Sequence, residues 1–176
     1  LPFDNLEALI QAKKPLVFFL DDLGQAPAAV QAAAMQLILG RRINGHAVSD
    51  FVIFIAATNR KQDRAGVQGI LEPVKSRFIT IIELTPDLND WCAWAQDHGM
   101  PGKLMGFMRF RPNLLADFRP TADMVNSPVP RTIAHVGELM NIGLLDDIPE
   151  AAHEAVTGAA GEGFANEFKM WLDVFS

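Results

Sequence analysis

"PLVFFLDDLGQA", residues 15–26, contains the first apolar run that is typical of a buried strand. Pro15 opens it, five apolar residues follow, and Asp21 and Asp22 stand side by side before a turn-like Leu-Gly. A short, continuous apolar run is typical of a strand that is covered on both faces of a parallel sheet. Two adjacent carboxylates at the end of such a strand need polar partners, which the rest of the chain has to supply.

The alternation of helices and strands after this stretch predicts a parallel sheet. A helix is predicted over residues 26–42, with Gly40 as its stop, and a second buried strand over residues 51–60, "FVIFIAATNR". A helix through residues 67–78 leads to a third predicted strand, "ITIIEL", at residues 79–84. Strands that alternate with helices in this order predict right-handed crossovers within one sheet.

The chain is expected to divide near Thr85-Pro86. Residues 1–85 hold the sheet and a turn around Asn44-Gly45. Residues 86–176 read as helices separated by loops that contain Pro and Gly, with no clear strand, and the aromatic and Met residues of 91–110 are predicted to form their core. The predicted fold class is therefore α/β, a partial parallel sheet followed by an all-helical domain.

Charge is spread unevenly along the chain. The 176 residues carry a net charge of −6, yet residues 41–77 hold seven Lys/Arg against three Asp/Glu, whereas residues 86–176 hold six against thirteen. The basic segment suggests a bound anion, an acidic neighbour or a solvated face, and the acidic total argues against a nucleic-acid partner. The single cysteine, Cys92, cannot form an internal disulfide, which favours a cytoplasmic location, and no apolar run is long enough to span a membrane.

Polar side chains follow both predicted inner strands at the point where each strand ends. Asp21 and Asp22 follow the first strand, and Thr58 and Asn59 follow the second. The carboxyl ends of parallel strands share one edge of the sheet, where ligands bind. One carboxylate there suits Mg²⁺, and the other carboxylate with the amide suits a water that attacks phosphorus. The alternative is structural: an acidic pair that caps the next helix and an asparagine in a turn.

Four segments together resemble the motifs of AAA+ ATPases. "LVFFLDD" (16–22) looks like a Walker B motif, "AATNR" (56–60) like sensor 1, "EPVKSRF" (72–78) like an arginine-finger motif and "SPVPRTIAHVGELM" (127–140) like the sensor-2 helix of a lid domain. Their order and spacing match the family. The resemblance is strongest to the MoxR-like branch. Three further segments resemble the lid domain of that branch: "DWCAWA", "FMRFRPNLL" and "GEGFANEFKMWL".

The resemblance implies a role for each residue at the sheet edge. Asp21 would help to hold Mg²⁺ beside ATP, and Asn59 would sense the γ-phosphate and position the attacking water. Asp22 would polarise that water, at a position where the family usually has glutamate. The shorter side chain is a departure from the family pattern, and it makes hydrolysis a weaker expectation than nucleotide binding.

Two arginines are expected to act from outside this edge. By the resemblance, Arg77 would reach the nucleotide of a neighbouring subunit, with Arg64 as a weaker second candidate, and Arg131 would contact phosphate from the lid. Arg131 follows Pro130, which favours the first turn of a helix, so its charge would oppose the helix dipole unless an anion lies nearby. Each arginine has the alternative of being an ordinary solvated surface charge.

A Walker A loop, G-x-x-x-x-G-K-[ST], does not occur in residues 1–176. The nearest imitation, "GAAGEGF" at residues 158–164, lacks the Lys-Ser/Thr pair and is interpreted as a loop before the last helix. The chain thus looks like the carboxyl-terminal portion of an ATPase that remodels a partner protein as a ring, expected to be hexameric. The alternatives are a non-catalytic ring subunit or adaptor that supplies Arg77 in trans, and a different Mg²⁺-dependent phosphohydrolase.

Overall fold

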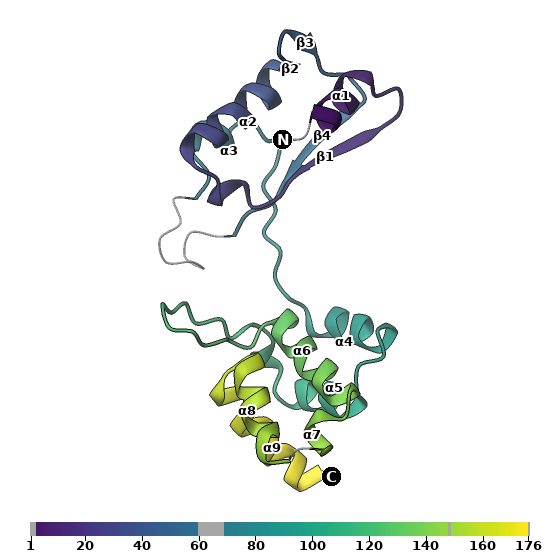
Figure 1. Ribbon diagram of the computed structural model, residues 1–176, viewed down its shortest axis with the longest axis vertical. Coiled ribbons are helices and arrows are strands. Elements are labelled where there is room, and N and C mark those ends of the chain that lie inside the picture. Colours follow the sequence, from purple (N-terminus) through teal and green to yellow (C-terminus); the bar gives the residue numbers. More distant parts are fainter. Residues whose placement is uncertain (1–2, 60–68, 148, 176) are drawn as a thin grey trace. The chain divides into compact units, whose positions relative to one another are not determined.

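The computed structural model describes residues 3–59, 69–147 and 149–175 (Figure 1). The chain divides into an amino-terminal unit, Leu1–Glu83, and a carboxyl-terminal unit, Leu84–Ser176. The division lies within two residues of the Thr85-Pro86 boundary expected from the sequence. Each unit has its own core, so each is described by itself.

The amino-terminal unit is a small mixed α/β structure. Its central sheet has two parallel strands, β1 and β4, whose register pairs Leu16 with Val52 and Leu20 with Ala56. The α/β class predicted for this part of the chain is therefore confirmed. In chain order the elements are α1 (Phe3–Gln11), β1 (Leu16–Leu20), the 3₁₀ turn η1 (Leu23–Gln25), α2 (Ala28–Gly40), β2 (Arg42–Ile43), β3 (His46–Ala47), β4 (Val52–Ala56) and α3 (Glu72–Lys75).

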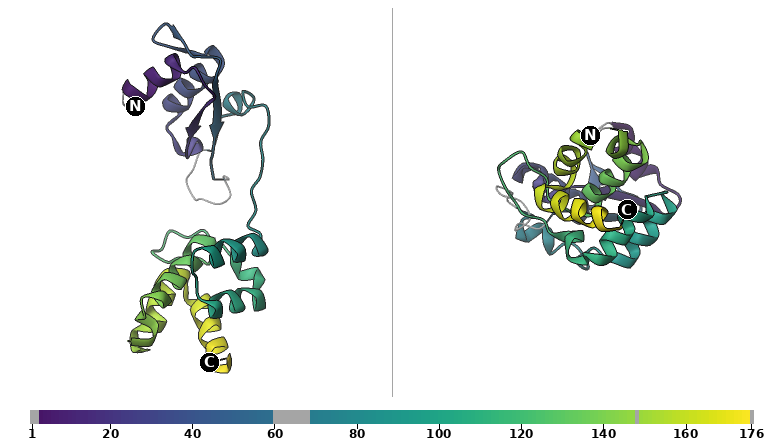
Figure 2. Two further views of the ribbon diagram at one scale, coloured as in Figure 1. Left: turned by 90° about the vertical axis from the view of Figure 1, so that its right-hand side faces the viewer. Right: turned by 90° about the horizontal axis from the view of Figure 1, so that it is seen from below.

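One face of this sheet carries the unit's core. Leu9 of α1, Val48 and Val52 are buried there, and Phe18 meets Phe54 edge-on with 6.0 Å between ring centroids. Figure 2 shows α1 and α2 on the same side of the sheet. Because β1 and β4 alternate between covered and exposed positions, their inward residues pack against the two helices.

The opposite face of the sheet is apolar and uncovered. Val17 and Phe19 of β1 and Ile53 and Ile55 of β4 point to it, and each side chain is between 45% and 56% exposed. We call these four residues the bare sheet face. Parallel sheets are ordinarily covered on both faces, as the uninterrupted apolar sequence of both strands led us to expect.

The prediction of a third strand over residues 79–84 is wrong. Residues 79–84 form no strand, and Ile79, Ile81, Ile82 and Leu84 are at least 72% exposed. A strand exists only where a neighbour accepts and donates its backbone hydrogen bonds, and within the described residues no strand pairs with this segment. The β-branched sequence alone is not enough to hold it in a sheet.

The end of α2 and the following hairpin lie where the sequence predicts them. Asn44 (φ 47°) and Gly45 (φ 86°) form the tight turn between β2 and β3, as predicted. The helix α2 ends at Gly40, as predicted, but Arg41 and not the glycine takes the left-handed conformation after it, with φ 46°. The Arg41 guanidinium donates to the carbonyl oxygens of Ser49 and Val52 at 2.7 and 3.1 Å, which holds it in place.

The carboxyl-terminal unit is helical, and no strand occurs in its described residues, in agreement with the sequence. No helix in the described part of the chain is long and apolar enough to cross a membrane. The elements are α4 (Leu88–Asp97), α5 (Gly102–Phe110), the 3₁₀ helix η3 (Pro112–Ala116), α6 (Pro130–Asn141), α7 (Leu144–Asp147), α8 (Pro149–Ala160) and α9 (Glu162–Phe175).

Aromatic side chains dominate the core of this unit. Phe107 of α5 packs against Phe164 and Phe168 of α9, with ring centroids 5.3 and 5.1 Å apart, and all three are buried. The prediction that the aromatic and Met residues of 91–110 form the core is correct for Trp91, Phe107 and Met108. It is wrong for Trp94 and Phe110, which are 40% and 63% exposed.

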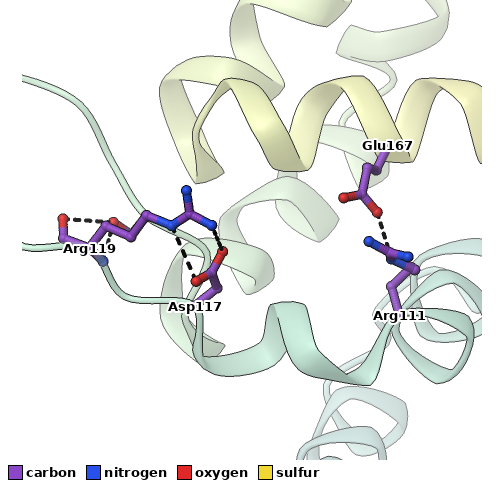
Figure 3. A network of polar contacts seen from close by, with 5 residues as sticks. Arg111, Asp117, Arg119 and Glu167 are labelled. Carbon is purple, nitrogen blue, oxygen red and sulfur yellow. Dashed lines mark hydrogen bonds and ion pairs between the residues drawn. The ribbon is translucent and has the colours of Figure 1, made fainter.

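Two features connect the helices of this unit. Figure 3 shows Arg111, after α5, facing Glu167 of α9, with 2.6 Å between Nε and Oε2.

The prediction of a loop over residues 158–164 is wrong, because α8 continues to Ala160 and α9 begins at Glu162. Gly161 alone separates the two helices, with φ 91°.

Candidate functional site

The hydrogen-bond ladder of β1 and β4 continues beyond the two strands. Ala57 N–H donates to the Leu20 carbonyl and Leu23 N–H donates to the Ala57 carbonyl, both at 3.0 Å. These two bonds hold the residues that follow each strand at one edge of the sheet. Asp21 and Asp22 lie beside Thr58 and Asn59 for this reason.

Asp22 and Asn59 are in direct contact at this edge. Asn59 Nδ2 donates to Asp22 Oδ1 at 3.1 Å, although 37 residues separate them in sequence. The expected proximity of these two side chains is confirmed. The capping alternative is wrong for Asp22, because its side chain makes no capping hydrogen bond to η1.

The backbone of Asp22 is in the left-handed region, with φ 51° and ψ 33°. A residue other than glycine is uncommon there, although Asp and Asn tolerate this region better than other side chains. This conformation reverses the chain between β1 and η1. The carboxylate of Asp22 thereby meets Asn59 at the sheet edge instead of continuing along the strand.

Asp21 supplies the second carboxylate of the site. Its Oδ1 accepts a hydrogen bond from the Asp22 backbone N–H at 3.0 Å, and both aspartates are exposed. Among the described residues, no cluster of three or more His, Cys, Asp or Glu side chains is placed to hold a metal ion. Two exposed carboxylates and an amide oxygen are hard donors that fit Mg²⁺, which keeps several waters and is completed by phosphate oxygens.

Gly24 allows the turn after β1 to lie against the end of β4. A Cβ atom at Gly24 would be 2.2 Å from Thr58 Oγ1 and 3.2 Å from a side-chain carbon of Ile70. No residue larger than glycine fits this position without moving Thr58. The Leu23-Gly24 pair signals a turn in the sequence, but it does not reveal this close contact.

Gln31 is the structural residue that sequence reasoning missed. It is fully buried on α2, where its Nε2 donates to the carbonyls of Ala26 and Gly69, both at 3.1 Å. Its Oε1 accepts from Leu71 N–H at 3.0 Å. Gln31 therefore ties the helix after the acidic pair to the segment leading into α3. A glutamine in an alanine-rich helix gives no sequence signal for this role, because it reads as a solvated residue.

The predicted arginines belong to different parts of the chain. Arg77 follows α3 in the amino-terminal unit, is exposed, and its guanidinium makes no hydrogen bond or ion pair with the described residues. Arg131 is exposed on the first turn of α6, in the carboxyl-terminal unit, and Pro130 begins that helix as predicted. Arg64 lies outside the described residues.

No protein-family model, curated protein or solved structure matches this chain. Any assignment of function therefore depends on the geometry of the site and on the motifs of the sequence.

The sheet edge combines two carboxylates, which accept hydrogen bonds, with a carboxamide that donates one. The Asp22 carboxylate accepts from Asn59, so the two side chains fix one another's orientation. A water molecule between a carboxylate and a carboxamide can be both deprotonated and aligned. The exposed Asp21 carboxylate beside them is free to take a hydrated cation. Groups of these kinds are suited to metal-assisted attack of water on a phosphate ester or anhydride.

Proposed function

We propose that this chain is part of a Mg²⁺-dependent AAA+ ATPase of the MoxR-like branch. In this proposal the protein works in the cytoplasm as a ring and couples ATP binding and hydrolysis to the remodelling of a partner protein. The observation that carries the proposal is the 3.1 Å hydrogen bond between Asn59 and Asp22, with Asp21 adjacent, at the carboxyl ends of two parallel strands. The sequence places a Walker B-like and a sensor 1-like motif at these positions.

Each site residue has a distinct part in this reaction. Asp21 would hold the hydrated Mg²⁺ that accompanies ATP, which neutralises charge on the phosphates. Asp22 would accept the proton of the attacking water, while Asn59 keeps Asp22 oriented and contacts the γ-phosphate. Arg77, exposed and without an ion-pair partner among the described residues, suits a guanidinium that reaches the nucleotide of another subunit. Arg131 would contact phosphate from α6.

The phosphates of ATP need a further partner in this proposal. A Walker A loop cradles phosphates with backbone N–H groups and a lysine, and residues 1–176 contain no such loop. The bare sheet face supports the view that the functional sheet has additional layers, because an exposed parallel sheet is unusual. The 176 residues by themselves are accordingly expected to hydrolyse ATP poorly or not at all.

The test measures the rate of ATP hydrolysis by the full-length protein that contains these residues. Asp22→Asn keeps the size of the side chain and tolerates the left-handed backbone, but it removes the base. It is expected to lower kcat by about 100-fold or more while nucleotide binding persists. Asp50→Asn is the matched control, because Asp50 is an exposed acid of the same unit outside the site. Equal turnover by wild type and Asp22→Asn would overturn the proposal.

A second candidate function is a non-catalytic ring subunit or adaptor. The observations that favour it are the aspartate at position 22, where the resembling family usually has glutamate, and the missing Walker A loop. In this case the full-length protein binds no nucleotide, yet it stimulates a competent ATPase subunit through Arg77. Mixing experiments with wild type and Arg77→Ala, together with a nucleotide-binding measurement, distinguish the two candidates.

A further inference from the structure

The segment of chain that follows α3 and leads to α4 carries exposed apolar side chains that the proposed ATPase function does not use. Ile79, Ile81, Ile82 and Leu84 are 105%, 72%, 74% and 90% exposed. Residues 79–87 are all exposed and belong to no helix or strand, and Figure 1 shows them as an open trace that runs into α4. Because water solvates large apolar side chains poorly, a partner that covers this segment is favoured.

The backbone of the segment is as open as its side chains. Within the described residues, no backbone hydrogen bond involves its three isoleucines, and the nearest one before it joins Phe78 N–H to the Lys75 carbonyl at 3.2 Å. The N–H and C=O groups of the isoleucines are therefore available to a partner that binds an extended peptide as an added strand. A segment inside a helix or strand offers these groups only after it opens locally.

These are the properties that an endoprotease needs in a folded substrate. Proteases cut where the backbone is exposed and free of hydrogen bonds, and elsewhere the chain has to open before it is cut. The six residues 79–84 contain four large apolar side chains, so an apolar pocket of a protease has several alternative side chains to accept. Both the backbone and the side chains of the segment favour the same kind of partner.

A second exposed apolar position provides a comparison within the same chain. Met124, at 104% exposure, lies in the loop between η3 and α6. This loop is tied at two points, because Asp117 N–H donates to the Pro128 carbonyl at 3.1 Å and Asn126 Nδ2 donates to the Gly158 carbonyl at 2.6 Å. Apolar exposure therefore occurs at both places, whereas freedom from such ties distinguishes residues 79–84.

The core of each unit lies entirely on one side of the segment in sequence. The buried cluster of the carboxyl-terminal unit begins at Trp91, and the core of the amino-terminal unit is formed by Leu9, Val48 and Val52. A cut within residues 79–84 thus removes no core residue. The carboxyl-terminal unit, which has the larger core, is expected to remain folded after the cut.

We propose that residues 79–84 are a cleavage site for an endoprotease that selects large apolar side chains. The protease binds the segment as an added strand, and one water molecule is added across a peptide bond, which gives a new carboxylate on one product and a new amino group on the other. The cut separates the unit that holds Asp22 and Asn59 from the unit that holds Arg131. The site itself does not depend on the proposed ATPase function.

The test is limited proteolysis of the whole 176-residue chain with thermolysin, which cuts on the amino side of large apolar residues. The products are identified over time by intact mass and by amino-terminal sequencing. Cleavage within residues 79–84 is expected to be about tenfold or more faster than cleavage before Met124 or Val125, because only the loop has to open first. Equal or slower cleavage within residues 79–84 overturns the proposal.

The carboxyl-terminal product gives a second readout. It is expected to keep a helical circular dichroism spectrum and to unfold in one cooperative thermal transition, because its aromatic core is complete. A product that is degraded as fast as it forms, or that shows no cooperative transition, contradicts the release of a folded unit.

A set of threonine substitutions tests the choice of side chains. Threonine is tolerated at exposed positions but does not fill a large apolar pocket, so cleavage within the segment is expected to slow about tenfold or more while the fold is kept. The changes, made together, are Ile79→Thr, Ile81→Thr, Ile82→Thr and Leu84→Thr. The matched control, Met124→Thr with Val125→Thr, should leave cleavage within residues 79–84 unchanged. If the fourfold variant is cut there at the wild-type rate, the apolar side chains do not define the site.

Discussion

At the scale of single residues, the backbone of Asp22 decides the geometry of the candidate site. Its left-handed conformation, with φ 51°, reverses the chain directly after β1 and brings the carboxylate to Asn59. Asp is one of the few side chains that tolerate this region well. A glutamate at the same position would extend the carboxylate by one methylene and would fit this backbone less well. Residue type and local conformation are therefore matched at position 22.

Gly24→Ala is expected to destabilise the amino-terminal unit. The new methyl group would lie 2.2 Å from Thr58 Oγ1 and 3.3 Å from the Ile70 backbone nitrogen, so the Thr58 side chain must rotate away or the turn must shift. Overpacking of this kind costs about 1–3 kcal/mol in free energy of unfolding. Chemical denaturation followed by circular dichroism measures the loss.

Gly40→Ala is the matched control for this change. A Cβ atom at Gly40 meets nothing within 4 Å, and the residue is the last of α2. Alanine there is expected to be neutral or to stabilise by about 0.5–1 kcal/mol, because it reduces the freedom of the unfolded chain. If both variants unfold at the same denaturant concentration, the close packing of Gly24 against Thr58 is not significant.

At the scale of the elements, helices α8 and α9 depend on a single residue between them. Gly161 has φ 91°, and its N–H donates to the Thr157 carbonyl at 2.8 Å, which ends α8. A Cβ atom there would lie 2.6 Å from the carbonyl oxygen of Asn126. Two independent constraints, backbone conformation and close approach, thus require glycine.

Gly161→Ala is expected to lower the stability of the carboxyl-terminal unit by about 1–3 kcal/mol, because alanine is strained at positive φ and collides with Asn126. Gly158→Ala is the matched control, since Gly158 lies within α8 and has open space around its Cα. That change is expected to stabilise by up to about 1 kcal/mol through higher helix propensity. Thermal unfolding of both variants gives the comparison. A neutral Gly161→Ala variant would show that the helix junction adapts freely.

The elements also show what sequence could and could not predict. The proximity of Asp22 and Asn59 was predictable, because the carboxyl ends of parallel strands share one edge and both residues follow apolar strands. The Asn44-Gly45 turn was predictable from its own two residues. A strand at residues 79–84 was not, since a strand depends on a partner that its own sequence does not encode. The role of Gln31 depends on carbonyl groups up to 38 residues away, which no local pattern reveals.

At the scale of the whole molecule, the two units have unequal cores. The carboxyl-terminal unit buries a large aromatic and aliphatic cluster around Phe107, Phe164 and Phe168. The core of the amino-terminal unit is centred on Leu9, Val48 and Val52, with only partly buried neighbours. The candidate site therefore lies in the unit with the smaller core. Additional strands or a partner subunit would contribute most to stability there.

The proposed ring makes a specific prediction about Arg77. In the full-length protein, Arg77→Ala is expected to lower kcat by about 10³-fold, because the transition-state charge loses its guanidinium. Mixing Arg77→Ala subunits with Asp22→Asn subunits should restore part of the turnover, since an intact Asp22 site then receives Arg77 from its neighbour. ATP hydrolysis across a range of mixing ratios measures this effect.

Lys75→Ala is the control for this experiment, because Lys75 belongs to α3 and pairs locally with Glu72. Lys75→Ala should change turnover little, and its activity should not depend on mixing with a second variant. If the mixture of Arg77→Ala and Asp22→Asn stays inactive while Arg77→Ala still assembles with wild type, Arg77 does not act in trans.

The bare sheet face has a consequence for handling the protein. The bare sheet face is an exposed hydrophobic patch made of Val17, Phe19, Ile53 and Ile55. Exposed strand edges beside such a patch tend to pair with strands of other molecules. The isolated chain should therefore be retained on hydrophobic resin, lose solubility as its concentration rises and precipitate sooner in ammonium sulfate. Replacing Ile53 and Ile55 with threonine, which keeps β-branching, would be a practical first step toward a well-behaved sample.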